Sequence, residues 1–221
     1  MTTDSRQLLV PPTIDMSYNH AFIDSSGNVT FSIREFKGVT TLWSHNNIDI
    51  TTLPVVRQIK ANCFKVRFNE RWAIAKFARF DWEIPFIQAE TVLYRTLDEH
   101  NGIAPKFLGH LHENGRIIGM LLEYIEGRKP INDQDYGACA RTLSRLHDSE
   151  LVHGDVNLDN FIVTGTGEAV LVDFENCRFG TDEDRAMEIM QLTREFEEPS
   201  GRGAPADYGE DYNEADYLIG I

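Results

Sequence analysis

The sequence has 221 residues, of which 42% are hydrophobic and 25% charged, a composition that suits one compact globular domain or two small ones around a shared cleft. It contains no apolar run of about 18 residues, so a transmembrane helix is excluded. The formal charge of −14 disfavours binding to nucleic acid unless a local basic face overcomes it. Three widely spaced cysteines and a polar N-terminus argue against a disulfide framework or a zinc site and predict a cytoplasmic protein.

The first sixty residues are predicted to carry few regular elements. Residues 1–19 are expected to form an irregular leader. His20 to Phe36 should form two short strands around a Ser-Ser-Gly-Asn turn. Further strands are expected at Val39 to Trp43 and at Val55 to Ile59.

Residues 63–78 carry the clearest strand signal. Apolar side chains alternate with polar or small ones on both sides of an Asn-Glu-Arg turn, which is the period of two that a β-hairpin requires. Pro85 suits the first turn of a helix, which is predicted to run to about Glu99 and to end at Asn101-Gly102. The expected buried face of this helix consists of Ile87, Val92, Leu93 and Leu97.

Another strand pair is predicted at Phe107–His110 and Ile117–Tyr124, with a Glu-Asn-Gly turn between them. His110 and His112 lie two residues apart and could share a metal ion. Because no third ligand is near them in the sequence, they are predicted to be solvent-facing polar residues instead.

The second half of the chain alternates helices with short strands. The predicted elements are helices at Asp133–His147 and Asp182–Phe196 and strands at Phe161–Val163 and Ala169–Val172. The fold class that follows is α+β. Its predicted parts are a β-rich part with one helix over residues 20–125, a reduced α-helical part over 126–198 and an acidic flexible tail over 199–221.

The segment 153–160 has the sequence His-Gly-Asp-Val-Asn-Leu-Asp-Asn and lies between a predicted helix and a predicted strand. Phosphoryl transfer needs a carboxylate that orients or deprotonates the acceptor hydroxyl, and oxygen ligands that hold Mg²⁺ on the phosphates. Asp155 can serve the first need and Asn160 the second. The alternative is a polar capping loop ahead of a strand.

A second motif follows eighteen residues after Asp155, where an apolar strand runs into the Asp-Phe-Glu triplet at 173–175. A carboxylate at a strand end, near Asn160, is a ligand that Mg²⁺ prefers. With these two motifs the sequence resembles the protein kinase-like superfamily, and its His-Gly-Asp variant is similar to aminoglycoside phosphotransferases, choline kinases and small atypical kinases. The resemblance implies a bilobal kinase-like fold that uses ATP and Mg²⁺. It also implies Asp155 as catalytic base, Asn160 and Asp173 as Mg²⁺ ligands and His153 as a structural anchor.

Residues upstream fit the same resemblance. Lys76 matches the strand lysine that contacts the α- and β-phosphates, and Glu90 in the next helix matches its ion-pair partner, so both join the candidate catalytic residues. The segment that contains Glu123 and Ile125 resembles the hinge between lobes, where backbone groups of both residues would bind adenine. Downstream, residues 183–189 resemble the last helix of the small kinase of the KEOPS tRNA-modification complex.

Three departures limit the resemblance. The turn that corresponds to the glycine-rich loop is Lys-Ala-Asn at 60–62, whereas backbone amides approach phosphates closely only where side chains do not intrude. Glu175 replaces the glycine after Asp-Phe, and it is either an added metal ligand, a substrate-binding residue for a cationic group or a surface residue. About ten residues separate Asp173 from the last helix, which leaves no room for the peptide-docking platform of a protein kinase.

The sequence therefore favours a Mg·ATP-dependent phosphotransferase or ATPase that acts on a small molecule or on itself. One alternative is a pseudokinase scaffold, which the missing glycine-rich loop motivates. Another is a kinase fold repurposed for a non-phosphoryl transfer, such as a tRNA-dependent arginine cyclodipeptide synthase of fungal natural-product biosynthesis, with Glu175 or Asp155 holding the arginine. No membrane association is expected, tRNA stays an open partner, and the acidic tail could bind a protein.

Overall fold

The computed structural model describes residues 17–97 and 102–202. Residues 1–16 of the predicted leader, the predicted helix end at 98–101 and residues 203–221 of the predicted tail lie outside the described residues. The chain divides into two compact units, residues 1–37 and 38–221. No helix in the described part of the chain is both long and apolar enough to cross a membrane.

In the first unit, β1 (His20–Ile23) and β2 (Val29–Ser32) pair as an antiparallel hairpin. The Asp24 carboxylate closes the turn by accepting backbone N–H groups of Ser26 and Asn28, the kind of local hydrogen bond for which aspartate is favoured in turns. The hairpin predicted within residues 20–36 is confirmed. Among the described strands it forms a sheet of its own.

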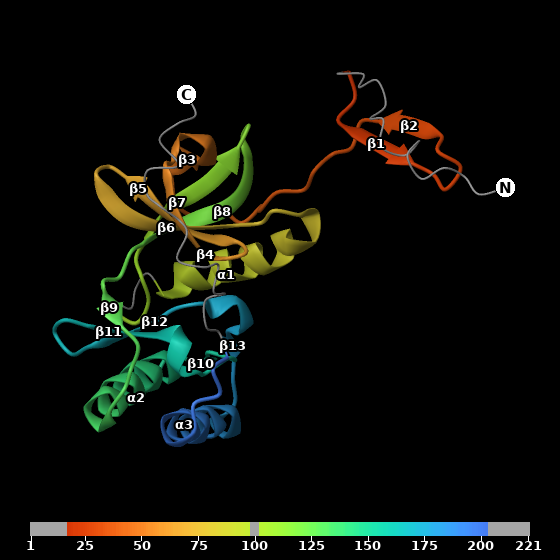
Figure 1. The fold of residues 1–221 in the computed structure, drawn as a ribbon. Helices are drawn as coiled ribbons and strands as arrows, with labels where there is room; N and C mark the ends of the chain where they lie inside the picture. The colour runs from red at the N-terminus through yellow and green to blue at the C-terminus, as the bar shows by residue number, and fades with distance from the viewer. Residues whose placement is uncertain (1–16, 98–101, 203–221) are drawn as a thin grey trace. The chain divides into compact units, whose positions relative to one another are not determined.

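In the second unit, the described strands include a six-stranded sheet with the order β3-β7-β8-β6-β5-β4 (Figure 1). Its strands are β3 (Asn47–Asp49), β4 (Val55–Lys60), β5 (Cys63–Phe68), β6 (Arg71–Phe77), β7 (Phe107–Glu113) and β8 (Arg116–Glu123). β3 and β7 run parallel, and the other neighbours are antiparallel. Positive φ angles at Asn69-Glu70 and Asn114-Gly115 provide the two-residue turns that join twisted antiparallel strands. The hairpin predicted over 63–78 and the strand pair around Asn114 are confirmed.

Helix α1 (Ile84–Leu97) packs against this sheet, as Figure 1 shows. Its buried side chains are Ile84, Ile87, Glu90, Thr91, Leu93, Tyr94 and Leu97. The prediction that Val92 belongs to this face was wrong, because 43% of its surface is exposed. The buried stripe includes Glu90 instead, since that carboxylate forms an ion pair with Lys76 of β6.

The strand predicted at Val39–Trp43 was also wrong, because none of the described residues in that range pairs as a strand. The Val39 side chain is buried and its N–H donates to the Ile117 carbonyl at 2.8 Å. The Trp43 indole N–H donates to the Thr91 carbonyl of α1 at 3.0 Å. These individual hydrogen bonds hold the segment against β8 and α1, in place of the repeated backbone hydrogen bonds of a paired strand.

His110 is fully buried, so the prediction that it faces solvent was wrong. Its Nε2 accepts the backbone N–H groups of Trp43 and Ser44, both at 3.3 Å. Burial lowers the pKa of His110, which keeps the ring neutral and able to accept these bonds. The side chain is therefore a structural acceptor for the segment that precedes β3.

The helical region, residues 127–202, follows the sheet (Figure 1). Its elements are β9 (Gly127–Arg128), α2 (Asp133–His147), β10 (Leu151–Val152), β11 (Phe161–Thr164), β12 (Ala169–Leu171), β13 (Arg178–Phe179) and α3 (Asp182–Glu197). Asn132 caps α2 by accepting the Asp135 N–H, and Thr181 forms a capping box with Asp184 at the start of α3. The two predicted helices and the two predicted strands of this part are confirmed.

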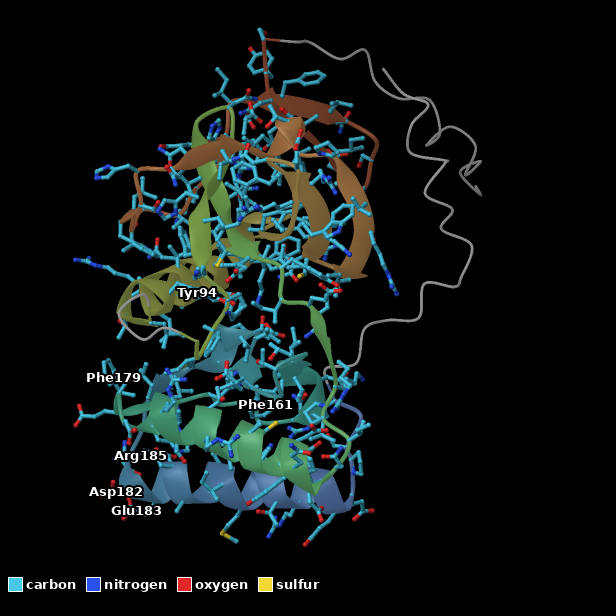
Figure 2. All side chains as sticks on the ribbon, turned by 90° about the vertical axis from the view of Figure 1, so that its left-hand side faces the viewer. Tyr94, Phe161, Phe179, Asp182, Glu183 and Arg185 are labelled. Atoms are coloured by element: carbon cyan, nitrogen blue, oxygen red, sulfur yellow. The ribbon has the colours of Figure 1, made fainter. Side chains whose placement is uncertain are left out.

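A continuous apolar core joins the sheet to the helical region. It includes Ile87 of α1, Met120 of β8, Leu143 of α2 and Leu171 of β12. Tyr94 and Phe161, which Figure 2 labels near α1 and in the helical region, both belong to this core. This packing holds the end of β12 and the loop after β10 directly beside the sheet, where the predicted site residues lie.

Candidate active site

The loop 153–160 is folded around the Asp155 carboxylate. The Asn157 and Asn160 side-chain amides donate to its Oδ2 at 3.1 and 3.2 Å, and the Asn160 amide also donates to the Asp155 carbonyl at 2.9 Å. Asn157 in turn accepts the N–H groups of Asp159 and Asn160 and is fully buried. Both predicted residues are therefore brought together by direct contact. Asn157 is a positioning residue of the loop that the sequence did not single out.

Glu188 of α3 anchors the start of this loop. Its carboxylate accepts the backbone N–H groups of His153 and Gly154 at 3.0 and 2.6 Å and pairs with His147 Nε2 at 2.8 Å. Burial opposes ionisation, but these bonds outweigh it and lower the pKa of Glu188. A buried carboxylate with this many donors fixes the loop relative to α2 and α3.

The backbone at position 154 explains why a glycine stands between His153 and Asp155. Its φ is +81°, and a Cβ at this position would lie 2.3 Å from the Asn176 carbonyl oxygen. Both the backbone conformation and the close approach exclude a side chain without movement of the backbone. Asn176, which follows the Asp-Phe-Glu triplet, is therefore packed directly on the loop 153–160.

The Asp173 backbone adopts a left-handed conformation, with φ 68° and ψ 64°, at the point where the chain leaves β12. A strained backbone conformation of this kind persists only where many surrounding contacts hold it in place, and it is often found at functional sites. Here the contacts come from buried Phe174, whose ring packs against Tyr94 and His153 with centroids 5.8 and 5.1 Å apart. His153 Nε2 donates to the Val172 carbonyl at 3.1 Å. His153 thus occupies the anchoring place that the resemblance implied.

Lys76 lies between two carboxylates. Its Nζ is 2.7 Å from Glu90 Oε2 and 2.6 Å from Asp173 Oδ1. Burial opposes the charge on Lys76, but Glu90 and Asp173 outweigh it, so the pKa of Lys76 is raised. The backbone around Lys76 is also closely packed, because a Cβ at Gly119 would lie 2.4 Å from its carbonyl oxygen. The predicted lysine, glutamate and aspartate meet in one ion-pair network.

Lys60 is the second cation on Asp173, and the sequence did not single it out as a site residue. Its Nζ lies 2.6 Å from Asp173 Oδ2. Burial alone would raise the pKa of Asp173, but Lys76 and Lys60 outweigh it and hold that pKa well below its usual range. Because 113 positions separate Lys60 from Asp173, no local pattern could have paired them.

A cavity of about 220 Å³ lies beside this network. Lys60, Lys76, Glu90 and Asp173 line it together with apolar side chains and the predicted hinge. Its other lining residues include Ile74, Leu122, Glu123, Tyr124, Ile125, Ile162 and Val172. The Glu123 N–H already donates to the Lys106 carbonyl at 2.8 Å, so only the carbonyl of Glu123 could serve a ligand.

Three predicted residues, Asp155, Asn160 and Glu175, do not line this cavity. Asp155 lies outside the set of lining residues and is about 29% exposed, which suits a group that meets a second substrate from outside. Glu175 is 44% exposed, and its carboxylate is 4.0 Å from Lys76 Nζ. It is therefore at the rim of the ion-pair network.

The donor set suits a Mg²⁺ ion held together with a polyphosphate. Asn160 Oδ1 is buried and has no hydrogen-bond partner among the described residues. A buried amide oxygen of this kind can coordinate a cation. The Asn160 carbonyl accepts the Val172 N–H at 3.0 Å, which places Asn160 beside Asp173. Within the described residues no group of three or more His, Cys, Asp or Glu side chains could hold a metal. A two-ligand protein site with phosphate and water oxygens is the usual Mg²⁺ arrangement.

Two further charged pairs near the site were missed. Lys129 and Asp159 form an ion pair, and both line the cavity. Arg202 lies 3.5 Å from Asp155 Oδ1 and 3.6 Å from Glu195 Oε1. Asp159 belongs to the loop motif, but its distant partner Lys129 and the tail residue Arg202 carry no motif that could have identified them.

Comparison with known proteins supports the kinase resemblance at a coarse level. The sequence model of the lipopolysaccharide kinase (Kdo/WaaP) family, which belongs to the protein kinase-like superfamily, matches residues 127–217. The match contains the loop 153–160 and the triplet 173–175, and it covers less than half of the chain, without Lys60, Lys76 or Glu90. No curated protein matches the chain significantly. The helical region is thus similar to that of a kinase family, which supports a transferase of the kinase type.

Proposed function

We propose that the protein is a Mg·ATP-dependent phosphotransferase of the small atypical kinase type, built as a bilobal kinase-like fold. The sheet with α1 is the N-terminal lobe, and residues 127–202 form the C-terminal lobe. The acceptor is a hydroxyl of a small molecule or of the protein itself. A sugar hydroxyl is one acceptor to test, because the matched family is named for lipopolysaccharide kinases.

The observation that carries this proposal is the position of Asp173. Its carboxylate is held by Lys76, which Glu90 holds in turn, and its backbone is tied through Val172 to Asn160. A kinase needs this set of groups, because a lysine-glutamate pair and an aspartate beside an asparagine bind the phosphates and their metal. The apolar walls at Ile74 and Leu122, next to the Glu123 carbonyl, suit a flat heterocyclic base.

Each residue has a role in the proposed reaction. Bound Mg·ATP would supply the phosphoryl group and the charge neutralisation that its transfer requires. Asp155 orients the acceptor hydroxyl and takes its proton, and the amides of Asn157 and Asn160 hold the carboxylate through Oδ2. Glu188 and Gly154 keep the loop at one distance from Asp173.

The first experiment is a calorimetric titration of the protein with Mg·ATP, with Asp173→Ala as the matched control. Binding that the variant loses would support the site. ADP release by the wild type, measured with and without a panel of sugars and amino alcohols, would then identify the acceptor class. Binding without turnover would favour a pseudokinase, and no binding at millimolar nucleotide would overturn the proposal.

No observation favours the tRNA-dependent alternative over this proposal. That alternative gives Glu175 or Asp155 the role of holding the arginine, and it requires a local basic face for the tRNA. The basic side chains of β4 to β6 are the candidate face, and Lys60 and Lys65 among them have intramolecular partners. Lys60 contacts Asp173, and Lys65 Nζ lies over the rings of Trp72 and Tyr124, at 4.6 and 4.2 Å from their centroids. Glu175 lies outside the lining of the cavity. Titration with charged tRNA is the test of this alternative.

A further inference from the structure

The turn between β4 and β5 faces the ion-pair network although it contains no glycine. Gln58 Nε2 donates to the Lys60 and Ala61 carbonyls at 3.3 and 3.5 Å, which ties the turn to its own strand. The pairing of β4 with β5 shifts register between Gln58 and Lys60. From this irregular strand end the Lys60 side chain extends into the cavity and reaches Asp173.

The two lysines differ in how firmly they are held. Lys76 is 8% exposed and has two carboxylate partners within 2.7 Å, whereas Lys60 is 33% exposed and its ammonium has one carboxylate partner, Asp173, among the described residues. An ammonium that is still partly hydrated and sits on a flexible side chain can exchange one partner for another at a small cost in free energy. Lys60 is thus the cation of this network that can move.

The charge balance of the cavity depends on Lys60. Lys60 and Lys76 together offset Glu90 and Asp173, and Lys129 offsets Asp159. Glu123 also lines the cavity, so its three lysines and four carboxylates sum to a charge of −1, and without Lys60 they would sum to −2. A polyphosphate would then be repelled more strongly from the cavity.

We propose that Lys60 is a phosphate-binding residue of the nucleotide site, which supplies from a side chain the positive charge that a glycine-rich loop supplies from backbone amides. This inference rests on the proposed function. In the nucleotide-free protein, Lys60 neutralises Asp173 Oδ2. In the nucleotide-bound protein, the same ammonium serves the polyphosphate, because a charge-assisted hydrogen bond to phosphate replaces the one to the carboxylate. Ala61 and Asn62 need not approach the phosphates, so the turn needs no glycine.

The test is a series of binding measurements with adenosine, AMP, ADP and ATP in the presence of Mg²⁺, on wild type and Lys60→Met. The loss of affinity in the variant should grow with the number of phosphates, from less than twofold for adenosine to about 10- to 100-fold for ATP. Lys60→Arg should recover most of the ATP affinity, because it keeps a cation of similar reach.

Lys65→Met is the matched control. It removes the same charge from the same hairpin, but the Lys65 ammonium lies over aromatic rings instead of at Asp173. An equal loss for adenosine and ATP in Lys60→Met would reveal a purely structural role and overturn the inference. An unchanged ATP affinity, or an equal effect of Lys65→Met, would also overturn it. Failure of the wild type to bind any of the four ligands would instead refute the proposed function itself.

Discussion

Asp173 is held differently from its two sides. From the helical region, which we call the floor, its backbone is held by the Val172–Asn160 hydrogen bond to loop 153–160 and by the buried ring of Phe174 next to it. From the sheet, which we call the roof, its carboxylate is held by the ammonium groups of Lys60 and Lys76. The floor is fixed by close-packed backbone that can hardly shift, whereas the roof reaches the site with long side chains that can exchange partners. We infer that the floor sets the catalytic geometry and the roof adapts to the ligand.

The largest effect is expected for Asp155→Asn, which tests whether the floor supplies the proton acceptor of the proposed reaction. The amide keeps the shape and can still accept from Asn157 and Asn160, but it cannot take a proton. Because a positioned general base contributes about 10²- to 10⁴-fold, turnover should fall by that factor. Nucleotide affinity should change little, since Asp155 does not line the cavity. Coupled ADP release and calorimetry measure the two quantities, and full turnover in the variant would remove Asp155 from the mechanism.

The backbone of the floor can be tested with Gly154→Ala. A Cβ there meets the Asn176 carbonyl at 2.3 Å, and φ is +81°, so we expect a loss of about 2–4 kcal/mol in the free energy of unfolding and a matching loss of turnover. Gly167→Ala is the control, because φ is +82° there but nothing lies within 4 Å. That variant should lose only about 1–2 kcal/mol, the cost of the left-handed backbone alone. Equal losses in urea unfolding would show that the close approach is unimportant.

The same contrast explains what the sequence could predict. The floor is encoded locally: Asp155, Asn160 and Asp173 lie in two short motifs, and the amides that hold the Asp155 carboxylate come from Asn157 and Asn160 of the same loop. Helices α2 and α3 and strands β11 and β12 were predicted within a few residues, because their caps and periodicity agree with their packing, whereas the two-residue strands β9, β10 and β13 were not predicted.

The roof is encoded by contacts between distant residues, and there the sequence paired Lys76 with Glu90 through the resemblance but misled on other residues. Because Glu90 is charged, the pattern of apolar residues included Val92 in the buried face of α1 and left Glu90 out of it. His110 was assigned to solvent, because nothing in the sequence shows that two backbone N–H groups converge on its ring. Lys60 lies in a turn without a motif, and its role depends on an aspartate 113 positions away.

The anchor between α3 and the catalytic loop can be weakened with Glu188→Gln. The amide keeps the size of the side chain but loses the charge that two backbone N–H groups and His147 stabilise. We expect a loss of about 1–3 kcal/mol in the free energy of unfolding at pH 7. Urea unfolding measures this loss, and a neutral result would contradict the anchoring role.

The anchor also predicts a pH dependence. The pKa of Glu188 is lower in the folded protein than its unfolded value of about 4.3, so its stabilising contribution is present above that value and is lost as pH falls through the folded pKa. Asp173 acts in the same direction, because its pKa is also lowered. Wild type should therefore lose stability steadily below about pH 5. Glu188→Gln should show a shallower loss in urea unfolding at pH 7, 5 and 4, and an unchanged slope would rule out Glu188 as a contributor.

The smallest effect is expected at Arg202, where the floor meets the chain that follows α3. Asp155 Oδ2 accepts both side-chain amides, while Oδ1 faces the Arg202 guanidinium at 3.5 Å. Arg202 is 51% exposed, and exposed ion pairs contribute about 0–1 kcal/mol, but its second partner Glu195 is buried, so Arg202→Ala should lower the free energy of unfolding by about 1 kcal/mol. Removal of the guanidinium uncovers the carboxylate oxygen that is left for an acceptor hydroxyl.

Turnover by Arg202→Ala should therefore rise by up to about fivefold, the factor that corresponds to breaking such a pair. Arg194→Ala is the control, because it removes the same charge from the exposed face of α3, whereas the described residues pair Asp155 with Arg202. High salt should give the wild type part of the same gain, since it screens exposed pairs. A fall in turnover would mean that Arg202 supports Asp155, in which case the floor would depend on a mobile side chain as the roof does.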